Sequence, residues 1–154
     1  MKLPIPLPIL RAMVAHARES YPAEACGIII GTTERLTRLT RCRNVQDDLH
    51  AEDPAAHPRT TRDGYSIHPQ DMFAIMKEAR ERGEAFRVIY HSHIDAGAYF
   101  SDEDKRVAIW EGEATYPEAA HVVISVVGGE PKEANIFRWN PGRREFDGEA
   151  LELP

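Results

Sequence analysis

The chain has 154 residues, of which 25 are acidic and 19 basic, giving a formal net charge of −6. Because a nucleic-acid-binding surface needs a basic footprint to meet phosphates, this balance argues against a general nucleic-acid binder. The hydrophobic fraction of 42% and the charged fraction of 29% are those of a soluble globular protein. No run of 18 apolar residues that could span a membrane occurs. We therefore expect no nucleic-acid and no membrane partner.

The chain contains two cysteines, Cys26 and Cys42, and no recognisable targeting signal. Two cysteines are too few for a disulfide framework or for a four-thiolate zinc site. The segment Met1–Leu10 has three prolines and no uninterrupted apolar stretch, unlike a signal peptide. These features predict a reduced, cytoplasmic protein.

The first half of the chain predicts a helix, two strands and a long loop. Residues 3–9 alternate with prolines and fit a short edge strand or an extended segment. Apolar residues recur at helical spacing over 8–20. The glycine-bracketed apolar run 26–31 predicts a buried strand, and 35–43 a second strand whose arginines lie on a solvated face. Residues 44–64 carry few apolar residues and predict the longest loop.

The second half predicts two helices and three strands. A helix over 69–82 has proline in its first turn and Gly83 just after its end. The remaining expected elements are a strand at 86–90, a loop at 94–100, a helix at 101–110, strands at 120–127 and 134–139, and a polar tail from residue 141. Helices interspersed with strands predict an α/β fold, with a central mixed β-sheet flanked by helices. We expect one domain over residues 1–154, with its core at about 5–140.

Two histidines one residue apart, His91 and His93, follow the strand at 86–90. Side chains at positions i and i+2 of a strand point to the same face, so both imidazoles can reach one metal ion. Asp104 lies eleven residues after His93, in the first turn of the next predicted helix. Two histidines, one aspartate and a water molecule would make a tetrahedral zinc site with an open position.

Each part of this pattern also has a purely structural interpretation. A lone His-x-His pair is a weak signal, because histidine is a common residue. Ser101-x-x-Asp104 is the pattern of a helix-capping box, which stabilises a helix without any chemistry. The two interpretations are compatible, because capping would fix the start of the helix and so direct Asp104 towards the metal.

The complete layout resembles the JAMM motif of MPN-domain zinc metallopeptidases. It consists of Glu24, then His91 and His93, then after seven residues Ser101, and after two more Asp104. Flanking segments fit the same family: Tyr21–Gly27, Val88–Tyr90, Ala98 and Tyr116–Pro117. The resemblance covers roughly residues 5–140 and is greatest to the small stand-alone prokaryotic members.

The resemblance implies a cytidine-deaminase-like fold and a role for each residue of the motif. His91, His93 and Asp104 would hold one zinc ion per chain. Glu24 would be the general base that activates a zinc-bound water, and Ser101 would hydrogen-bond the developing oxyanion. Ser92, on the opposite strand face, would serve the structure.

Two positions depart from the family pattern. Proline often follows the second histidine and another precedes the serine, whereas this chain has Ile94 and Phe100 there. Neither is a ligand position, so the departures concern the shape of the 94–100 loop and the fit of the substrate. Tyr99 and Phe100 are available to line a substrate groove.

The resemblance further implies a peptidase or isopeptidase that cuts an amide at the C-terminal Gly-Gly of a ubiquitin-like or sulfur-carrier protein. A homodimer remains open. The alternative is a non-enzymatic interaction module on the same fold, but silent relatives have lost the ligands and here all four positions are filled. A zinc deaminase would need His-x-Glu and Pro-Cys-x-x-Cys pairs, which are absent.

The other histidines and Cys26 are weaker candidates for a catalytic or metal-binding role. His16 and His121 lack partners at ligand spacing and are expected to be structural. His50 and His57 share the 44–64 loop with several acidic residues, so a second metal site is conceivable, but a solvated loop beside the substrate groove is favoured. His68 precedes a proline and should serve the helix start, and Cys26 should be a packing residue.

Overall fold

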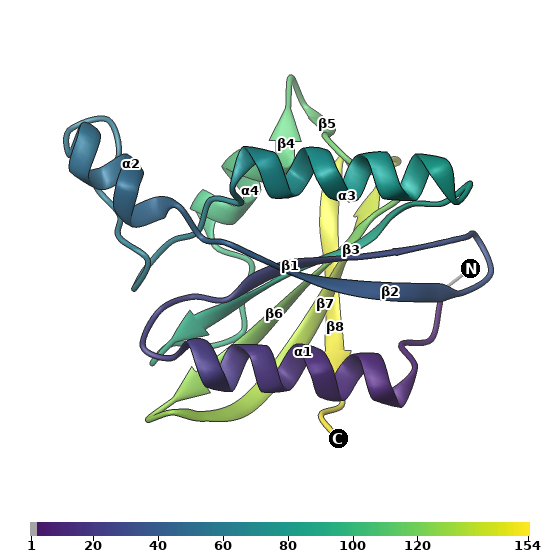
Figure 1. Ribbon diagram of the computed structural model, residues 1–154, viewed down its shortest axis with the longest axis horizontal. Coiled ribbons are helices and arrows are strands. Elements are labelled where there is room, and N and C mark those ends of the chain that lie inside the picture. Colours follow the sequence, from purple (N-terminus) through teal and green to yellow (C-terminus); the bar gives the residue numbers. More distant parts are fainter. Residues whose placement is uncertain (1–2) are drawn as a thin grey trace.

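A six-stranded sheet forms the centre of the structure, a computed structural model that describes residues 3–154 (Figure 1). Its strands are β1 (Cys26–Gly31), β2 (Leu36–Cys42), β3 (Ala85–Ile94), β6 (Ala120–Val127), β7 (Glu130–Asn140) and β8 (Glu145–Leu151). They lie in the order β2-β1-β3-β6-β7-β8. Every neighbouring pair is antiparallel except β3 and β6, which run parallel. The predicted mixed sheet is confirmed.

One long helix covers each face of the sheet (Figure 1). Helix α1 (Leu7–Ser20) packs on the face that presents Ile29 of β1, and α3 (Pro69–Glu81) packs on the face that presents Ile28 and Ile30. Strand β1 is buried along its whole length. Because both faces of β1 are covered, its sequence is a continuous apolar run without polar alternation.

The face under α1 contains a buried pair of polar rings. His16 Nδ1 lies 2.6 Å from the hydroxyl of Tyr90, which is fully buried on β3. The Tyr90 ring passes directly over Gly27, where an added Cβ would stand 2.3 Å from its atoms. Glycine is therefore required at position 27, and His16 is structural as predicted.

Strand β3 is longer than the sequence suggests. The apolar run ends at Tyr90, so the predicted strand stopped there, with the histidines at its exit. In the structure β3 continues to Ile94, with His91 paired to Cys26 of β1 and His93 to Ser125 of β6. Pairing with β6 as far as Ile94, together with the Ser92 N–H that donates to the carbonyl of Ala25, extends the strand through polar residues.

The predicted loop 44–64 contains a short helix, α2 (Gln46–Glu52), which lies beyond the edge of the sheet (Figure 1). Its first turn carries Asp47 and Asp48, and carboxylates are favourable at a helix N-terminus. Gln46 is buried, donates to the carbonyl of Arg59 and accepts from the Ser66 hydroxyl. These long-range contacts, invisible in a local pattern, hold a helix with almost no apolar face.

Two predictions for the second half of the chain were wrong in extent. The expected polar tail is part of the sheet, because residues 145–151 form β8 and pair with β7 from Asn140–Glu145 to Ala134–Leu151. Phe146 of β8 contacts the ring of Trp139 across the strands. The helix expected to reach Trp110 is α4 (Asp102–Ala108), which is followed by the small hairpin of β4 (Ile109–Trp110) and β5 (Glu113–Ala114).

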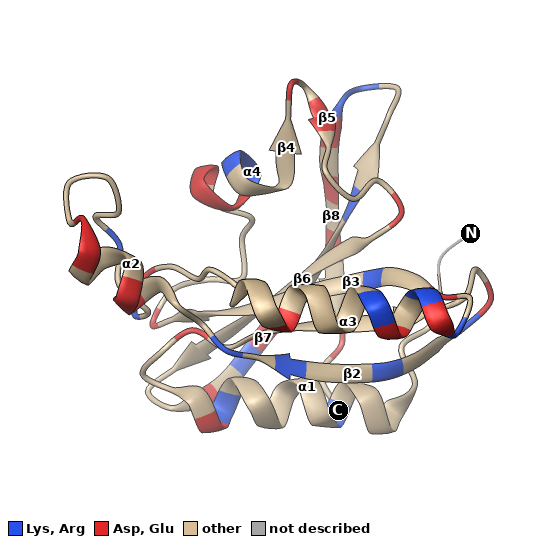
Figure 2. Cartoon of the chain, turned by 45° about the horizontal axis from the view of Figure 1, so that its top comes forward, with Lys and Arg blue, Asp and Glu red and all other residues tan. Residues whose placement is uncertain are grey.

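The arginines of the β2 region are solvent-exposed, as predicted, but they do not share one face of the sheet. They pair with acidic residues of the two helices that flank the sheet: Arg38 with Glu78, Arg41 with Glu19, and Arg43 with Asp71. Basic residues along β2 therefore lie close to acidic residues of α1 and α3 (Figure 2). None of the helices within residues 3–154 has the length and apolar content needed to cross a lipid bilayer.

Candidate metal centre

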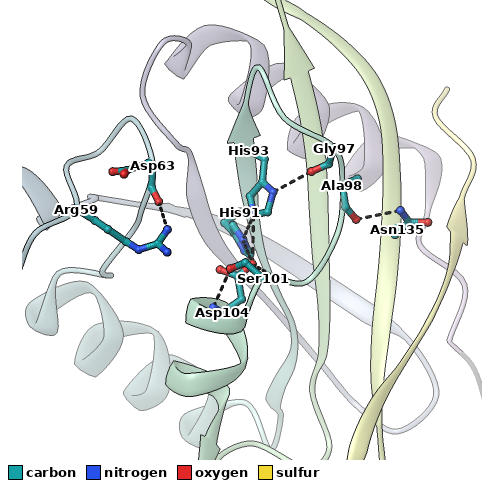
Figure 3. Close-up of polar contacts among 9 residues, drawn as sticks. All are labelled: Arg59, Asp63, His91, His93, Gly97, Ala98, Ser101, Asp104 and Asn135. Carbon is teal, nitrogen blue, oxygen red and sulfur yellow. Dashed lines mark hydrogen bonds and ion pairs between the residues drawn. The ribbon is translucent and has the colours of Figure 1, made fainter.

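Three side chains that could bind a metal converge at one end of β3 (Figure 3). His91 Nε2 and His93 Nε2 lie 3.2 Å apart, and each lies 3.2 Å from Asp104 Oδ2. All three residues are buried. The structure thus brings together the two histidines and the aspartate that the sequence singled out.

Strand β3 and its neighbours fix the two imidazole rings. His91 and His93 point to the same face because they are two residues apart on one strand. The ring of Tyr65 stacks on His91 with centroids 4.4 Å apart. His93 Nδ1 lies 2.9 Å from the carbonyl oxygen of Gly97 and donates to it, because a carbonyl can only accept. In a neutral ring this leaves the lone pair on Nε2, directed towards the cluster.

Asp104 is positioned by the start of α4. The backbone N–H of Ser101 donates to Asp104 Oδ2, and the N–H of Asp104 donates to Ser101 Oγ, both at 3.0 Å. This reciprocal pair is the predicted capping box. Burial raises the pKa of Asp104, but hydrogen bonds with His91 and His93, the charge of His91 and the backbone N–H of Ser101 outweigh it and hold the pKa well below its ordinary value. Asp104 is therefore a carboxylate at neutral pH.

The donor set fits a metal ion. Burial lowers the pKa of His91, which favours its neutral form. The acceptor atoms of two rings and one carboxylate then face each other at 3.2 Å, an arrangement that needs a cation or a shared proton between them. His91 Nδ1 is also buried without a hydrogen-bond partner among the described residues. Two nitrogens and one oxygen are the donors that catalytic zinc sites use.

Glu24 lies beside this cluster, just before β1. Its N–H donates to the carbonyl of Thr61, and its carbonyl accepts from the Asn44 amide. Both contacts hold its backbone and leave the carboxyl group in a cavity of about 110 Å³, which His93, Ser101 and Asp104 also line. Burial, reinforced by the charges of Asp104 and Asp63, raises the pKa of Glu24 to about 9. The carboxyl group is thus poised to hold a proton.

The rest of the cavity wall comes mainly from a segment that local patterns did not single out. Residues 59–65 fold over the site and contribute Arg59, Arg62 and Asp63. The only indication in the sequence that this segment contributes to the site was the length of the loop over 44–64. Tyr99 lines the cavity and stands edge-on to His93 at 5.0 Å between centroids.

Phe100 does not line this cavity, contrary to the prediction. Its ring is buried between the sheet and α4, where it stacks on Phe137 and contacts Phe146 and His121. The strand β8, which the sequence pattern did not reveal, supplies Phe146 and so draws Phe100 into the core. At position 100, where the family often has a proline, this chain therefore has an aromatic ring that fills space beneath the 94–100 loop.

The remaining candidates are structural. Ser92 Oγ accepts from the N–H of Ala25 on the face opposite the cluster, and His68 caps α3 by accepting from the N–H of Gln70. His50 Nδ1 bonds the carbonyl of His57, and within residues 3–154 no second group of metal-binding side chains forms around them. His121 is buried, and the Cys26 thiol lies in the core under α3.

Comparison with known proteins assigns the chain to a family. The profile of the family described as prokaryotic homologs of the JAB domain (Prok-JAB) matches residues 6–141. The chain belongs to the prokaryotic JAB-domain family. It is 27% identical over 130 residues to a protein of Mycobacterium tuberculosis named CysO-cysteine peptidase, covering 84% of this chain and 77% of that protein. A peptidase of the same name in Mycobacterium bovis matches equally.

Solved structures agree on the fold. The solution structure of a protein from Desulfitobacterium hafniense aligns with a TM-score of 0.70 at 23% identity, over 99% of this chain and 93% of that one. A Salinibacter ruber protein aligns at 0.64 with 28% identity, over 100% and 92%. A JAB1/MPN domain protein from Archaeoglobus fulgidus aligns at 0.51 with 14% identity, over 99% and 94%. The predicted MPN-type α/β fold is confirmed.

Proposed function

We propose that the protein is a zinc-dependent peptidase that hydrolyses the amide following the C-terminal Gly-Gly of a ubiquitin-like or sulfur-carrier protein. In this proposal His91, His93 and Asp104 hold the zinc, Glu24 is the general base and Ser101 stabilises the oxyanion. One observation carries it: three donor residues converge, and two of them, His93 and Asp104, line a cavity together with the buried Glu24, which is not one of the donors. The name of the mycobacterial relatives supports the peptidase class.

Zinc at such a centre supplies a water molecule whose pKa is lowered to ~7 and a Lewis acid for the substrate carbonyl. Glu24 takes the proton from the attacking water and passes it to the leaving amine. The raised pKa of Glu24 suits the transfer of the proton to the leaving amine, because the protonated form of the carboxyl group is easily reached. The carboxylate form needed for the first is favoured when the neighbouring cluster holds a divalent cation.

The hydroxyl of Ser101 has its hydrogen available for the substrate. Its oxygen already accepts from the N–H of Asp104, so the O–H is free to donate. Ser101 lines the cavity together with the three residues nearest the reaction, Glu24, His93 and Asp104. A donor in that position stabilises the negative charge that develops on the carbonyl oxygen.

The size of the cavity supports a Gly-Gly tail. At about 110 Å³ it is far smaller than the roughly 300–1,000 Å³ of pockets that enclose a drug-sized ligand. Glycines bring no side chains into that space, and Tyr99 at its rim can press on the extended tail. The CysO-cysteine peptidase name of the relatives points to a sulfur-carrier type of substrate.

Mass spectrometry of a carrier reaction tests the proposal. The protein is loaded with zinc and incubated with a ubiquitin-like sulfur carrier extended by one cysteine after its Gly-Gly. We expect loss of the added residue, abolition by a chelator and recovery on adding zinc. An intact carrier, alongside zinc-dependent cutting of an unrelated peptide, would keep the metal centre and remove this substrate class.

A further inference from the structure

Two guanidinium groups, those of Arg59 and Arg62, lie in the wall of the metal-site cavity. They differ in their partners. Arg62 is exposed and reaches the carboxylate of Asp95 at 3.5 Å. Arg59 is half-buried and forms no ion pair with any residue in the described range 3–154. Arg59 therefore brings into the site a guanidinium group that has no paired carboxylate among the described residues.

The side chain of Arg59 is held in place. Its Nη1 donates to the carbonyl of Asp63 at 2.8 Å, and its aliphatic stem passes over Gly64, where a Cβ would stand 3.1 Å from that of Arg59. Figure 3 shows the guanidinium end directed towards the His91 and Asp104 side chains. A carbonyl uses one donor and cancels no charge, so the other N–H groups remain available for an anion.

The acidic groups of the cavity wall are already engaged. Glu103 pairs with Arg106 at 2.6 Å, and the Asp63 carboxylate accepts from the N–H of Thr60. Asp104 belongs to the donor cluster, and Glu24 is the proposed base. The charge of Arg59 acts on Glu24 and Glu103 through space but forms no ion pair with either, so its guanidinium N–H groups remain available to an anion of the substrate.

We propose that Arg59 binds the free α-carboxylate of the residue that leaves, and so restricts the enzyme to removing a single C-terminal residue. The inference rests on the proposed function, since it assigns the leaving side of that reaction. Successive Cα atoms stand ~3.8 Å apart, so a carboxylate one residue beyond the scissile bond still lies within the small cavity. A lysine isopeptide offers no carboxylate there, because its leaving amine ends a four-carbon chain.

The test compares two substrates that differ only in this charge. A carrier ending in Gly-Gly-Cys with a free carboxylate is compared with the same carrier ending in the carboxamide. In the wild type we expect kcat/KM to be about 10- to 100-fold higher for the carboxylate, the range of a charge-assisted hydrogen bond. Arg59→Met, which keeps the aliphatic stem, should bring that ratio to about one by lowering the rate for the carboxylate substrate more than the rate for the carboxamide. Arg59→Lys should retain part of the ratio.

Two controls separate recognition from indirect effects. The charge of Arg59 lowers the pKa of Glu24, so its loss could slow the reaction generally, but that effect falls on both substrates alike. Arg62→Met removes the neighbouring, paired guanidinium and should leave the ratio unchanged. Equal losses on both substrates in Arg59→Met, or a wild type that does not discriminate, would overturn the inference.

A binding measurement keeps this inference separate from the proposed function. Calorimetry with Glu24→Gln and the peptides Gly-Gly-Cys and Gly-Gly-Cys-amide needs no turnover. We expect tighter binding of the carboxylate peptide and loss of that preference in Glu24→Gln/Arg59→Met. A wild type that cleaves no carrier, with this preference present, would remove the proposed reaction and leave the anion site. Equal binding of both peptides would remove the anion site itself.

Discussion

Only the side chain of Glu24 is available to the site, because the backbone of Glu24 is hydrogen-bonded to Thr61 and Asn44. Glu24→Gln keeps the shape of the residue and removes its ability to transfer a proton. We expect turnover to fall by ~100- to ~10,000-fold with metal content unchanged. Glu19→Gln, at an exposed glutamate paired with Arg41, is the matched control. A Glu24→Gln protein that loses its metal would instead make Glu24 a ligand.

The ring of His93 is fixed on one side by Gly97 and faces the cluster on the other. His93→Ala removes one of the proposed ligands, so we expect loss of bound zinc as measured by elemental analysis of the purified protein. His50→Ala, a histidine outside the cluster, should keep one zinc per chain. Full metal content in His93→Ala would contradict the ligand assignment.

His16 should make the fold sensitive to acid. Burial, with a smaller effect of Arg41, lowers the pKa of His16 to about 4, whereas the ring titrates near ~6.5 in the unfolded chain. Between these values the unfolded state binds more protons than the folded state, so stability falls as the pH drops from about 6.5 to 4. Urea unfolding across this window should show a smaller loss for His16→Gln than for the wild type. Parallel curves would show that His16 does not contribute.

At the scale of the element, α4 begins with a capping box that also directs Asp104. Ser101→Ala should lower stability by ~1 kcal/mol through loss of the cap. If Ser101 also donates to the oxyanion, transition-state stabilisation falls by ~3 kcal/mol. Ser101→Thr, which keeps a hydroxyl, is the control, and melting temperature is measured beside kcat. A lower melting temperature with unchanged turnover would make the role of Ser101 purely structural.

Helices and strands that are specified by neighbouring residues could be predicted from the sequence. Helices α1 and α3 have helical spacing with proline in the first turn, Gly83 follows the end of α3, and β1 is an apolar run with glycines near its ends. The elements that were missed depend on partners elsewhere in the chain. α2 is held by Gln46 through contacts with Arg59 and Ser66, and β8 by pairing with β7. A window of neighbouring residues does not contain those partners.

At the scale of the molecule, the site is assembled from segments far apart in sequence. The spacing of His91, His93 and Asp104 predicted their convergence, because a strand face and a helix start constrain direction strongly. Nothing local marked Tyr65 or Arg59, which reach the cavity only because residues 59–65 fold back over β3. The three donor residues could thus be foreseen from the sequence, but the cavity wall that residues 59–65 form could not.

The parallel pairing of β3 and β6 determines where the chain can accept inserted residues. Parallel neighbours cannot be joined by a tight turn, so residues 95–119 must travel the length of the sheet before β6 begins. The β4–β5 hairpin lies within this stretch, and its tip at Gly112 borders neither the donors nor the cavity. Extra residues inserted there would add surface while His91, His93, Asp104 and Glu24 kept their places. The long connection that the parallel strands require can thus carry new recognition surfaces while the arrangement of the site residues stays the same.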